Sequence, residues 1–155
     1  MTDLFNFLCE AKKNTFAKGL DCNRVEESVD GSLDYEYQLG NYKYHATMFG
    51  TTRFTGQEVV YKDGFVIWAV SYYGFLLDEK MDPEEFKKIL REALMKVGDL
   101  LFMPVRGPKK CKIGDYKYTC EITGGLEFFA GTESIFKDDK RIYVLRLNGG
   151  RIDYD

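Results

Sequence analysis

The sequence predicts a single α+β domain in which a mostly antiparallel, curved sheet carries two helices on one face. Three observations predict this class. The chain has 155 residues, which suits one domain of average size. Aromatic residues make up 15% of the chain, and these residues favour strands. Two short sequence patterns recur in the same order in the two halves, which indicates a duplicated structural unit.

The repeat consists of two matching patterns. The word LGNYKY, which begins at Leu39, recurs as IGDYKY, which begins at Ile113. The pattern Phe-x-Gly-x-Glu that ends at Glu58 recurs and ends at Glu133. Chance rarely produces two such matches in order, so we expect an internally duplicated helix-plus-antiparallel-strands unit with a pseudo-two-fold axis. The two copies are approximately residues 39–74 and 113–149 of the single domain 1–155.

Two segments have the periodicity and end signals of amphipathic helices. The first is expected at residues 3–18, and Gly19 lies where a helix should stop. The second is expected at residues 83–97, where Asp82 can cap the N-terminus and Pro83 fits the first helical position. Each helix precedes one copy of the repeat, and we expect both helices on one sheet face.

The rest of the chain predicts strands joined by tight turns. Gly40-Asn41 and Asp63-Gly64 are turn signals between alternating segments. Residues 19–32 and 98–112 contain Gly, charge and, in the second segment, Pro, and are expected to be loops. The expected strands are residues 35–39, 42–48, 57–62, 65–73, 116–122, 132–137 and 141–147.

The turn at Asp63-Gly64 also predicts how its two flanking strands pair. A simple two-residue turn places Glu58 opposite Ala69, on the sheet face away from Trp68. Glu133 is the equivalent residue in the second copy. Both faces are then largely apolar, which predicts cover on both sides. The helices would cover the Trp68 face, and the other face would need sheet curvature, a partner subunit or a ligand.

The sheet face opposite the helices is therefore the candidate ligand-binding site. Its candidate residues are Glu58, Glu133, Ser71, Arg146 and Tyr73. A carboxylate on an apolar face can meet a cationic or hydroxylated ligand, or hold a raised pKa suited to acid–base catalysis. In the structural alternative, which we favour, each carboxylate pairs with a neighbouring cation, such as Arg146 beside Glu133.

Other polar residues carry less specific signals. His45, the only histidine, is expected at the surface or in a hydrogen bond, because a single histidine supplies too few ligands for a typical zinc site. Arg106, Lys109, Lys110 and Lys112 form a basic run. This run is suited to a phosphate or an acidic partner, but a solvated loop is the favoured interpretation.

The cysteines and tyrosines leave further alternatives open. The spacing of Cys9, Cys22, Cys111 and Cys120 matches no zinc pattern, so free thiols are expected. Six tyrosines in the strands either line a pocket or form an aromatic core, and the core is favoured. They are Tyr35, Tyr37, Tyr42, Tyr44, Tyr116 and Tyr118.

Composition narrows the range of partners. The net charge is −3 and no basic stripe is present, so direct nucleic-acid binding is not expected. The longest apolar run, residues 65–70, is too short to span a bilayer. The N-terminus has no signal-peptide pattern, which predicts a cytoplasmic protein. No phosphate-binding loop, dinucleotide fingerprint or metal motif is found, so no cofactor and no metal are expected.

Four patterns together resemble a known family. They are FLxEAKKNT from Phe7, FxGxEVV from Phe54, WAxxYYG from Trp68 and YxYxCE from Tyr116. This combination resembles a bacterial domain of unknown function that occurs alone or C-terminal to Xre-type helix-turn-helix modules. The resemblance implies no activity and no site residues. Association with a DNA-binding module implies a sensing or partner-binding role, and the module itself is not found in this sequence.

We therefore expect a non-enzymatic, sensor-like domain that binds a small ligand or a protein partner at the sheet face opposite the helices. One alternative is a hydrolase or acid–base enzyme that uses Glu58 and Glu133, which requires both carboxylates to reach one cavity. The other alternative is a structural homodimer that buries this sheet face.

Overall fold

A computed structural model describes residues 2–98 and 103–155 of the chain. These residues form two helices, α1 (Thr2–Lys13) and α2 (Pro83–Leu94), and nine strands. The strands are β1 (Arg24–Val25), β2 (Leu33–Leu39), β3 (Tyr42–Gly50), β4 (Arg53–Lys62), β5 (Phe65–Leu76), β6 (Lys110–Ile113), β7 (Tyr116–Gly125), β8 (Phe128–Lys137) and β9 (Lys140–Arg151).

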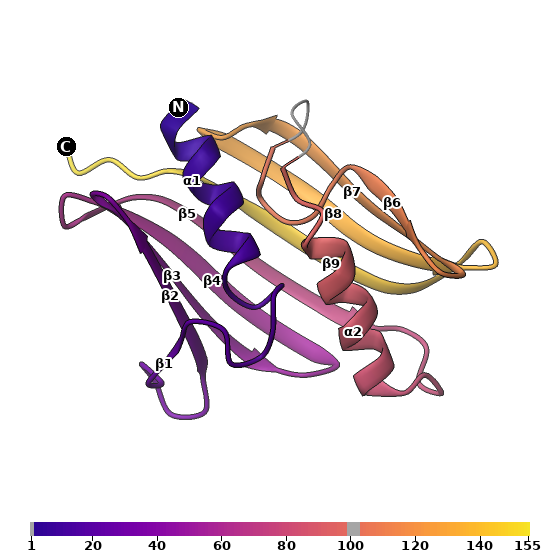
Figure 1. Cartoon of the computed structure of the whole chain (residues 1–155). Helices are drawn as coiled ribbons and strands as arrows, with labels where there is room; N and C mark the ends of the chain where they lie inside the picture. The colour runs from indigo at the N-terminus through magenta and orange to yellow at the C-terminus, as the bar shows by residue number, and fades with distance from the viewer. Residues whose placement is uncertain (1, 99–102) are drawn as a thin grey trace.

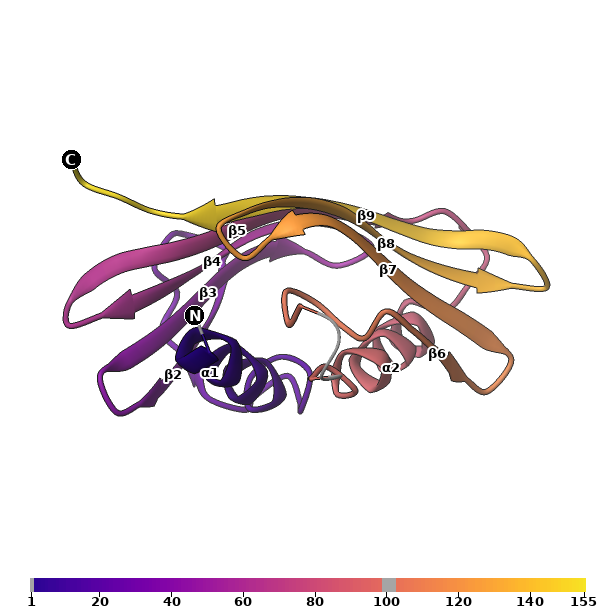
Figure 2. The same ribbon diagram turned by 90° about the horizontal axis from the view of Figure 1, so that it is seen from above.

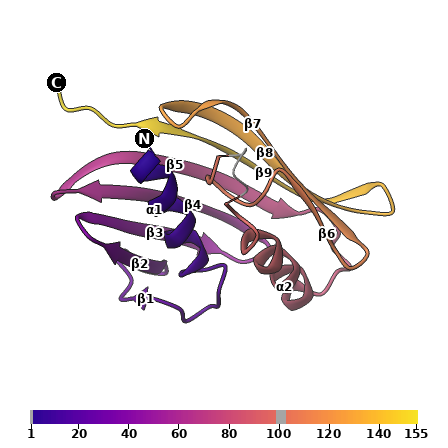
Figure 3. The same ribbon diagram turned by 45° about the horizontal axis from the view of Figure 1, so that its top comes forward.

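All nine strands belong to one open antiparallel sheet, in the order β1-β2-β3-β4-β5-β9-β8-β7-β6. The sheet is curved, and both helices lie on its concave face (Figures 1 and 2). α1 contacts β2 and β3, near one end of the strand order, whereas α2 contacts β6 at the opposite end of the same face (Figure 3). The predicted class, an α+β fold with two helices on one face of an antiparallel sheet, is confirmed.

The strand order is symmetric about the middle of the sheet. β5 pairs with β9, and β4, β3 and β2 follow on one side while β8, β7 and β6 follow on the other. The turn between β2 and β3 has Gly40 at φ 62°, and the turn between β6 and β7 has Gly114 at φ 57°. A duplicated unit would give this arrangement, and the duplication itself stays a prediction.

α2 begins as its sequence predicts. The Asp82 side chain accepts a hydrogen bond from the Glu84 backbone N–H at 3.4 Å, and Pro83 is the first helical residue. The helix ends at Leu94 instead of residue 97, and a turn follows it. Its buried residues recur at helical spacing and pack toward the sheet. They are Phe86, Ile89, Leu90, Ala93 and Leu94.

α1 ends earlier than expected, at Lys13 and not at residue 18. The side chains of Asn14 and Thr15 donate hydrogen bonds to backbone carbonyls four residues earlier, at 2.7 and 2.9 Å. Such side-chain bonds compete with the backbone bonds that would continue a helix. Residues 14–18 therefore form turns, with the Lys18 N–H donating to the Thr15 carbonyl at 3.0 Å.

The seven predicted strands are confirmed, and each extends beyond its expected limits. β1 and β6 lie in segments that were expected to be loops. They lie at the two edges of the sheet and have two and four residues. Strands this short do not show the alternation that identifies a strand in a sequence.

A helix that crosses a membrane must be long and apolar. Neither α1 nor α2 is long and apolar enough to cross a membrane.

The pairing of β4 with β5 contains a bulge that corrects the predicted register. Val60 pairs with Trp68 and Glu58 pairs with Val70, because Ile67 is an extra residue on β5. A shift of one residue exchanges the two faces of a strand. Glu58 therefore lies on the same face as Trp68, beneath the helices, and its predicted position on the opposite face is wrong.

The pairing of β8 with β9 has the same feature. Ile135 pairs with Tyr143 and Glu133 pairs with Leu145, which leaves Ile142 as the extra residue. Glu133 therefore also lies on the helix-bearing face. The outer face is left with mainly polar exposed side chains and needs no cover, so the predicted two-sided apolar sheet is wrong as well. These outer residues include Thr55, Gln57, Ser71, Arg146 and Asn148.

Candidate functional site

Glu58 and Glu133 are both buried beneath the helices, and each pairs with a cation. Glu58 is 4% exposed and bonds to Lys12 of α1. Glu133 is fully buried and accepts hydrogen bonds from the Nε and Nη2 of Arg106 at 3.1 and 2.9 Å. A buried charge is costly unless it is paired. The structural alternative, ion pairing of both carboxylates, is therefore confirmed, although the partner of Glu133 is not Arg146.

The other three candidate residues lie on the opposite side of the sheet. Ser71, Tyr73 and Arg146 are exposed on the outer face, where Gln57 donates a hydrogen bond to the Ser71 hydroxyl at 3.2 Å. The thickness of the sheet separates them from the two glutamates. The predicted site opposite the helices is therefore not assembled, because the two bulges place its carboxylates on the other face.

The carboxylate of Glu133 is fully engaged by hydrogen-bond donors. Besides the two bonds from Arg106, it accepts bonds from the hydroxyls of Tyr118 and, at 2.6 Å, Tyr143. A carboxylate has about four lone-pair sites, so four donors saturate it. Burial and the adjacent Glu133 carboxylate raise the pKa of both tyrosines well above the ordinary value. This arrangement holds the strands β7, β8 and β9 together.

Arg106 reaches Glu133 because residues 103–108, the plug loop, enter the space beneath the helices (Figure 2). Residues 104–108 are buried, and the Gly107 N–H donates to the Tyr118 hydroxyl at 3.0 Å. A Cβ atom at Gly107 would lie 2.5 Å from that hydroxyl oxygen, so glycine is required here. Arg106 thus departs from the predicted solvated loop, whereas the three lysines of the basic run are exposed as predicted.

Glu58 has different surroundings. The Nζ of Lys12 also lies 5.8 Å from the centre of the Tyr44 ring. Burial lowers the pKa of Lys12, and the neighbouring Glu58 carboxylate opposes this effect. Burial and the same carboxylate raise the pKa of Tyr44 and Tyr72. Lys12 lies four residues after Leu8 on the buried face of α1, and this spacing could have identified it from the sequence.

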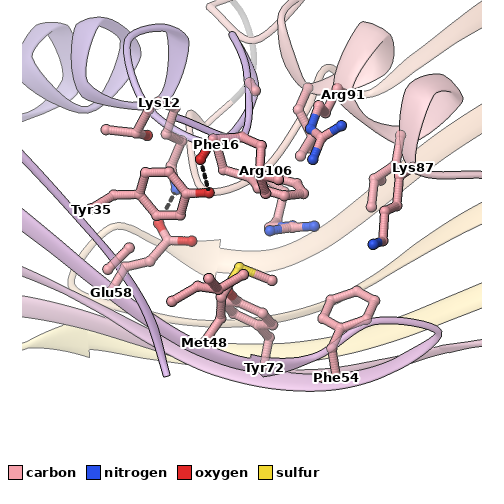
Figure 4. Close-up of a pocket in the computed structure, with 18 of the residues that line it drawn as sticks. Lys12, Phe16, Tyr35, Met48, Phe54, Glu58, Tyr72, Lys87, Arg91 and Arg106 are labelled. Carbon is pink, nitrogen blue, oxygen red and sulfur yellow. Dashed lines mark hydrogen bonds and ion pairs between the residues drawn. The ribbon is translucent and has the colours of Figure 1, made fainter. Parts of the chain in front are cut away.

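A cavity of about 70 Å³ lies between the helices and the sheet, next to Glu58. Figure 4 shows side chains from α1, α2 and the sheet that converge on it. Among its described lining residues, four are cations and one is a carboxylate, Glu58; Glu133 does not line it. The cations are Lys12, Lys87, Arg91 and Arg106. Its apolar wall includes Phe16, Met48, Phe54, Phe86 and Leu90.

A second polar cluster occupies the outer face of β2 and β3. The two ring nitrogens of His45 lie 2.9 Å from Glu36 and 2.6 Å from Asp34, which confirms the predicted hydrogen-bonded histidine. Burial alone would raise the pKa of Asp34, but hydrogen bonds from Ser32, Ser28 and His45 hold it well below its usual range. The cluster fastens the segment before β2 to the sheet. In residues 2–98 and 103–155, no three or more His, Cys, Asp or Glu side chains form a group that could hold a metal ion.

The predicted aromatic core is confirmed. Tyr35, Tyr44 and Tyr118 are buried in the core, and the other three tyrosines pack partly buried against it. Tyr35 and Tyr44 also line the cavity, so the pocket interpretation applies to these two residues. All four cysteines are free thiols, as predicted, and burial raises the pKa of Cys120 to about 12.

Comparison with known proteins gave one match. No curated protein and no solved structure matched the chain. A family model described as a domain of unknown function, DUF5680, matches residues 46–152. This match covers more than half of the chain, from β3 through the end of β9, and includes both glutamates and the plug loop. The chain therefore belongs to the DUF5680 family of domains of unknown function.

Proposed function

We propose that this domain is a non-enzymatic, sensor-like module that binds a small ligand in the cavity next to Glu58. The observation that carries the proposal is the cavity itself, whose mostly apolar wall is interrupted by a few buried charged groups. Small-molecule sites usually have this form, a concave apolar surface with a few convergent polar groups. The proposed site is thus on the helix-bearing face, in contrast to the outer face that the sequence suggested.

The surroundings of the two glutamates favour binding over catalysis. An enzyme that used both carboxylates for proton transfer would need both at one cavity, and Glu133 does not line it. The four hydrogen bonds to Glu133 also occupy the oxygens that would exchange a proton. The homodimer alternative assumed an apolar outer face that a second copy would bury. The outer sheet face is mainly polar, so it needs no partner as cover.

The walls of the cavity suit a sensing role. α2 supplies Phe86, Leu90 and Arg91 to the cavity wall that faces the sheet. Lys12 of α1 and Phe16, in the turns after α1, also contribute to this wall. A ligand that touches both helices and the sheet stabilises their packing by mass action. We further infer that the fold arose by duplication of one unit, of which one half kept an open cavity.

Cavity filling tests the proposed site. A fragment library of small organic compounds is screened by ligand-observed NMR against the wild type and the Ala46→Leu variant. Ala46 is a buried lining residue, so the added side chain should fill the cavity and abolish binding. Ala130→Leu, on the exposed outer face, is the matched control and should keep wild-type binding. The proposal fails if no fragment binds the wild type, or if Ala46→Leu binds the same fragments equally well.

A further inference from the structure

We infer that the ligand of this cavity is a small organic anion, a carboxylate attached to one compact apolar group. This inference rests on the proposed function and names the class of ligand that the site would take. It is carried by the charges that remain unbalanced around the cavity, by a buried guanidinium N–H without a partner, and by the size and character of the wall.

Two of the four cations that line the cavity are already neutralised. Lys12 pairs with Glu58, and Arg106 pairs with Glu133. The two others are Lys87 and Arg91 of α2. They are four residues apart and therefore lie on the same face of the helix, one turn from each other. The cavity thus keeps an excess of positive charge on the α2 side, which favours an anion and disfavours a cation.

Arg91 has an unsatisfied donor. Its Nε is buried and has no hydrogen-bond partner among the described residues. Its guanidinium lies over the ring of Phe16, with 4.8 Å between the Cζ atom and the ring centre. A buried donor without a partner is unusual in folded proteins. The planar guanidinium fork matches a carboxylate, which can accept two parallel hydrogen bonds from it.

Lys87 adds a second positive charge beside Arg91. Its ion pair with Glu84 is long, at 3.7 Å, and the Glu84 side chain is 79% exposed while that of Lys87 is 21% exposed. Water and salt screen such an exposed carboxylate, so this pair is weak. The ammonium group of Lys87 therefore remains available to a bound anion. Figure 4 shows Lys87 and Arg91 on the same wall of the cavity.

The opposite wall fits an apolar group. Met48 and Phe54 of the sheet face the α2 side chains across the cavity (Figure 4). The volume of about 70 Å³ is well below the 300–1,000 Å³ of sites for drug-sized ligands. The site therefore suits a single ring or a short branched chain, with its carboxylate toward Arg91 and its apolar group toward Met48 and Phe54.

Four compounds separate charge from shape. Isothermal titration compares benzoate with benzamide and benzylammonium, which share the ring, and with inorganic phosphate, which has the charge and no apolar group. We expect benzoate to bind at least about tenfold more tightly than each of the other three. The Arg91→Met variant should lose about tenfold or more of the benzoate affinity and keep the benzamide affinity. Arg146→Met, on the exposed outer face, should change neither.

The outcomes distinguish this inference from the proposed function. If benzamide or benzylammonium binds as tightly as benzoate, the cavity binds ligands but does not select an anion, and the inference is wrong. If phosphate binds as tightly as benzoate, the apolar group contributes nothing, which also overturns it. If Arg91→Met and Arg91→Lys, shown to be folded by circular dichroism, both keep full benzoate affinity, Arg91 does not bind the anion. If none of the three ring compounds and none of the fragments binds, the proposed function itself fails.

Discussion

Glu58 and Glu133 occupy matching positions in the sheet, yet the protein surrounds them differently. Glu133 accepts four hydrogen bonds and does not border the cavity. Glu58 pairs with Lys12 and borders the cavity. The same strand position can therefore hold a carboxylate that is enclosed by hydrogen-bond donors or one that borders a cavity, depending on which side chains surround it.

One residue difference accounts for part of this contrast. Tyr143 lies opposite Ile135 on the Glu133 side, and Trp68 lies opposite Val60 at the matching position on the Glu58 side. The Tyr143 hydroxyl donates to Glu133, whereas the indole N–H of Trp68 donates to the Leu126 carbonyl at 3.0 Å. Glu58 therefore lacks a hydrogen-bond donor equivalent to the hydroxyl that Tyr143 provides to Glu133.

The largest effect is expected from Arg106→Met. This change leaves the carboxylate of Glu133 buried without its cation, and breaking such a pair costs about 3–5 kcal/mol of unfolding free energy. Urea unfolding followed by circular dichroism measures it. Arg146→Met is the matched control, because Arg146 is exposed on the outer face and should cost within about 0.5 kcal/mol. A cost for Arg106→Met as small as this control would contradict the structural role of the pair.

A smaller effect is expected from Lys12→Met on the other side. Glu58 borders the cavity, where water can solvate a carboxylate that has lost its partner. We therefore expect a cost of about 1–3 kcal/mol in the same urea experiment, which is less than for Arg106→Met. If Lys12→Met costs as much unfolding free energy as Arg106→Met or more, Glu58 and Glu133 are equally enclosed, which contradicts the difference between them.

Alkaline pH should act on the tyrosines of the Glu133 side. The pKa of Tyr143 is raised in the folded protein, so between the unfolded value of about 10 and the folded value the native state binds more protons. The unfolding free energy that this raised pKa contributes is fully present below pH 10. It is lost as the pH rises above 10, by about 1.4 kcal/mol per pH unit for each such tyrosine. Tyr143→Phe should make this fall less steep in urea unfolding at pH 10 to 11, while Tyr73→Phe, at an exposed position, should leave the slope unchanged. An unaltered slope in Tyr143→Phe would show that Tyr143 titrates alike in both states.

Local signals predicted much of the fold. The cap at Asp82 and the turn at Gly40-Asn41 each depend on a few neighbouring residues, so the sequence sufficed to locate α2 and the β2–β3 hairpin. The two bulges at Ile67 and Ile142 depend on how whole strands pair, and a strand pattern does not reveal a single extra residue. The predicted sheet faces were wrong for this reason.

The site was harder to predict than the fold. Glu58 and Glu133 stood out as matching residues, and Lys12 could have been identified from its helical spacing to Leu8. Arg106 could not be assigned to Glu133, because its position depends on the path of the plug loop beneath the helices. The cavity itself is formed by segments far apart in the chain, so no sequence pattern identifies it.

The cavity borders Glu58, whereas Glu133 is not among its described lining residues. Crystals of the protein pressurised with xenon reveal this difference, because xenon occupies apolar cavities without a specific chemical partner. We expect anomalous density for xenon beside Met48 and Phe54, and none beside Tyr143 and Glu133. Xenon next to Glu133, or no xenon in the cavity next to Glu58, would contradict this difference between the two glutamates.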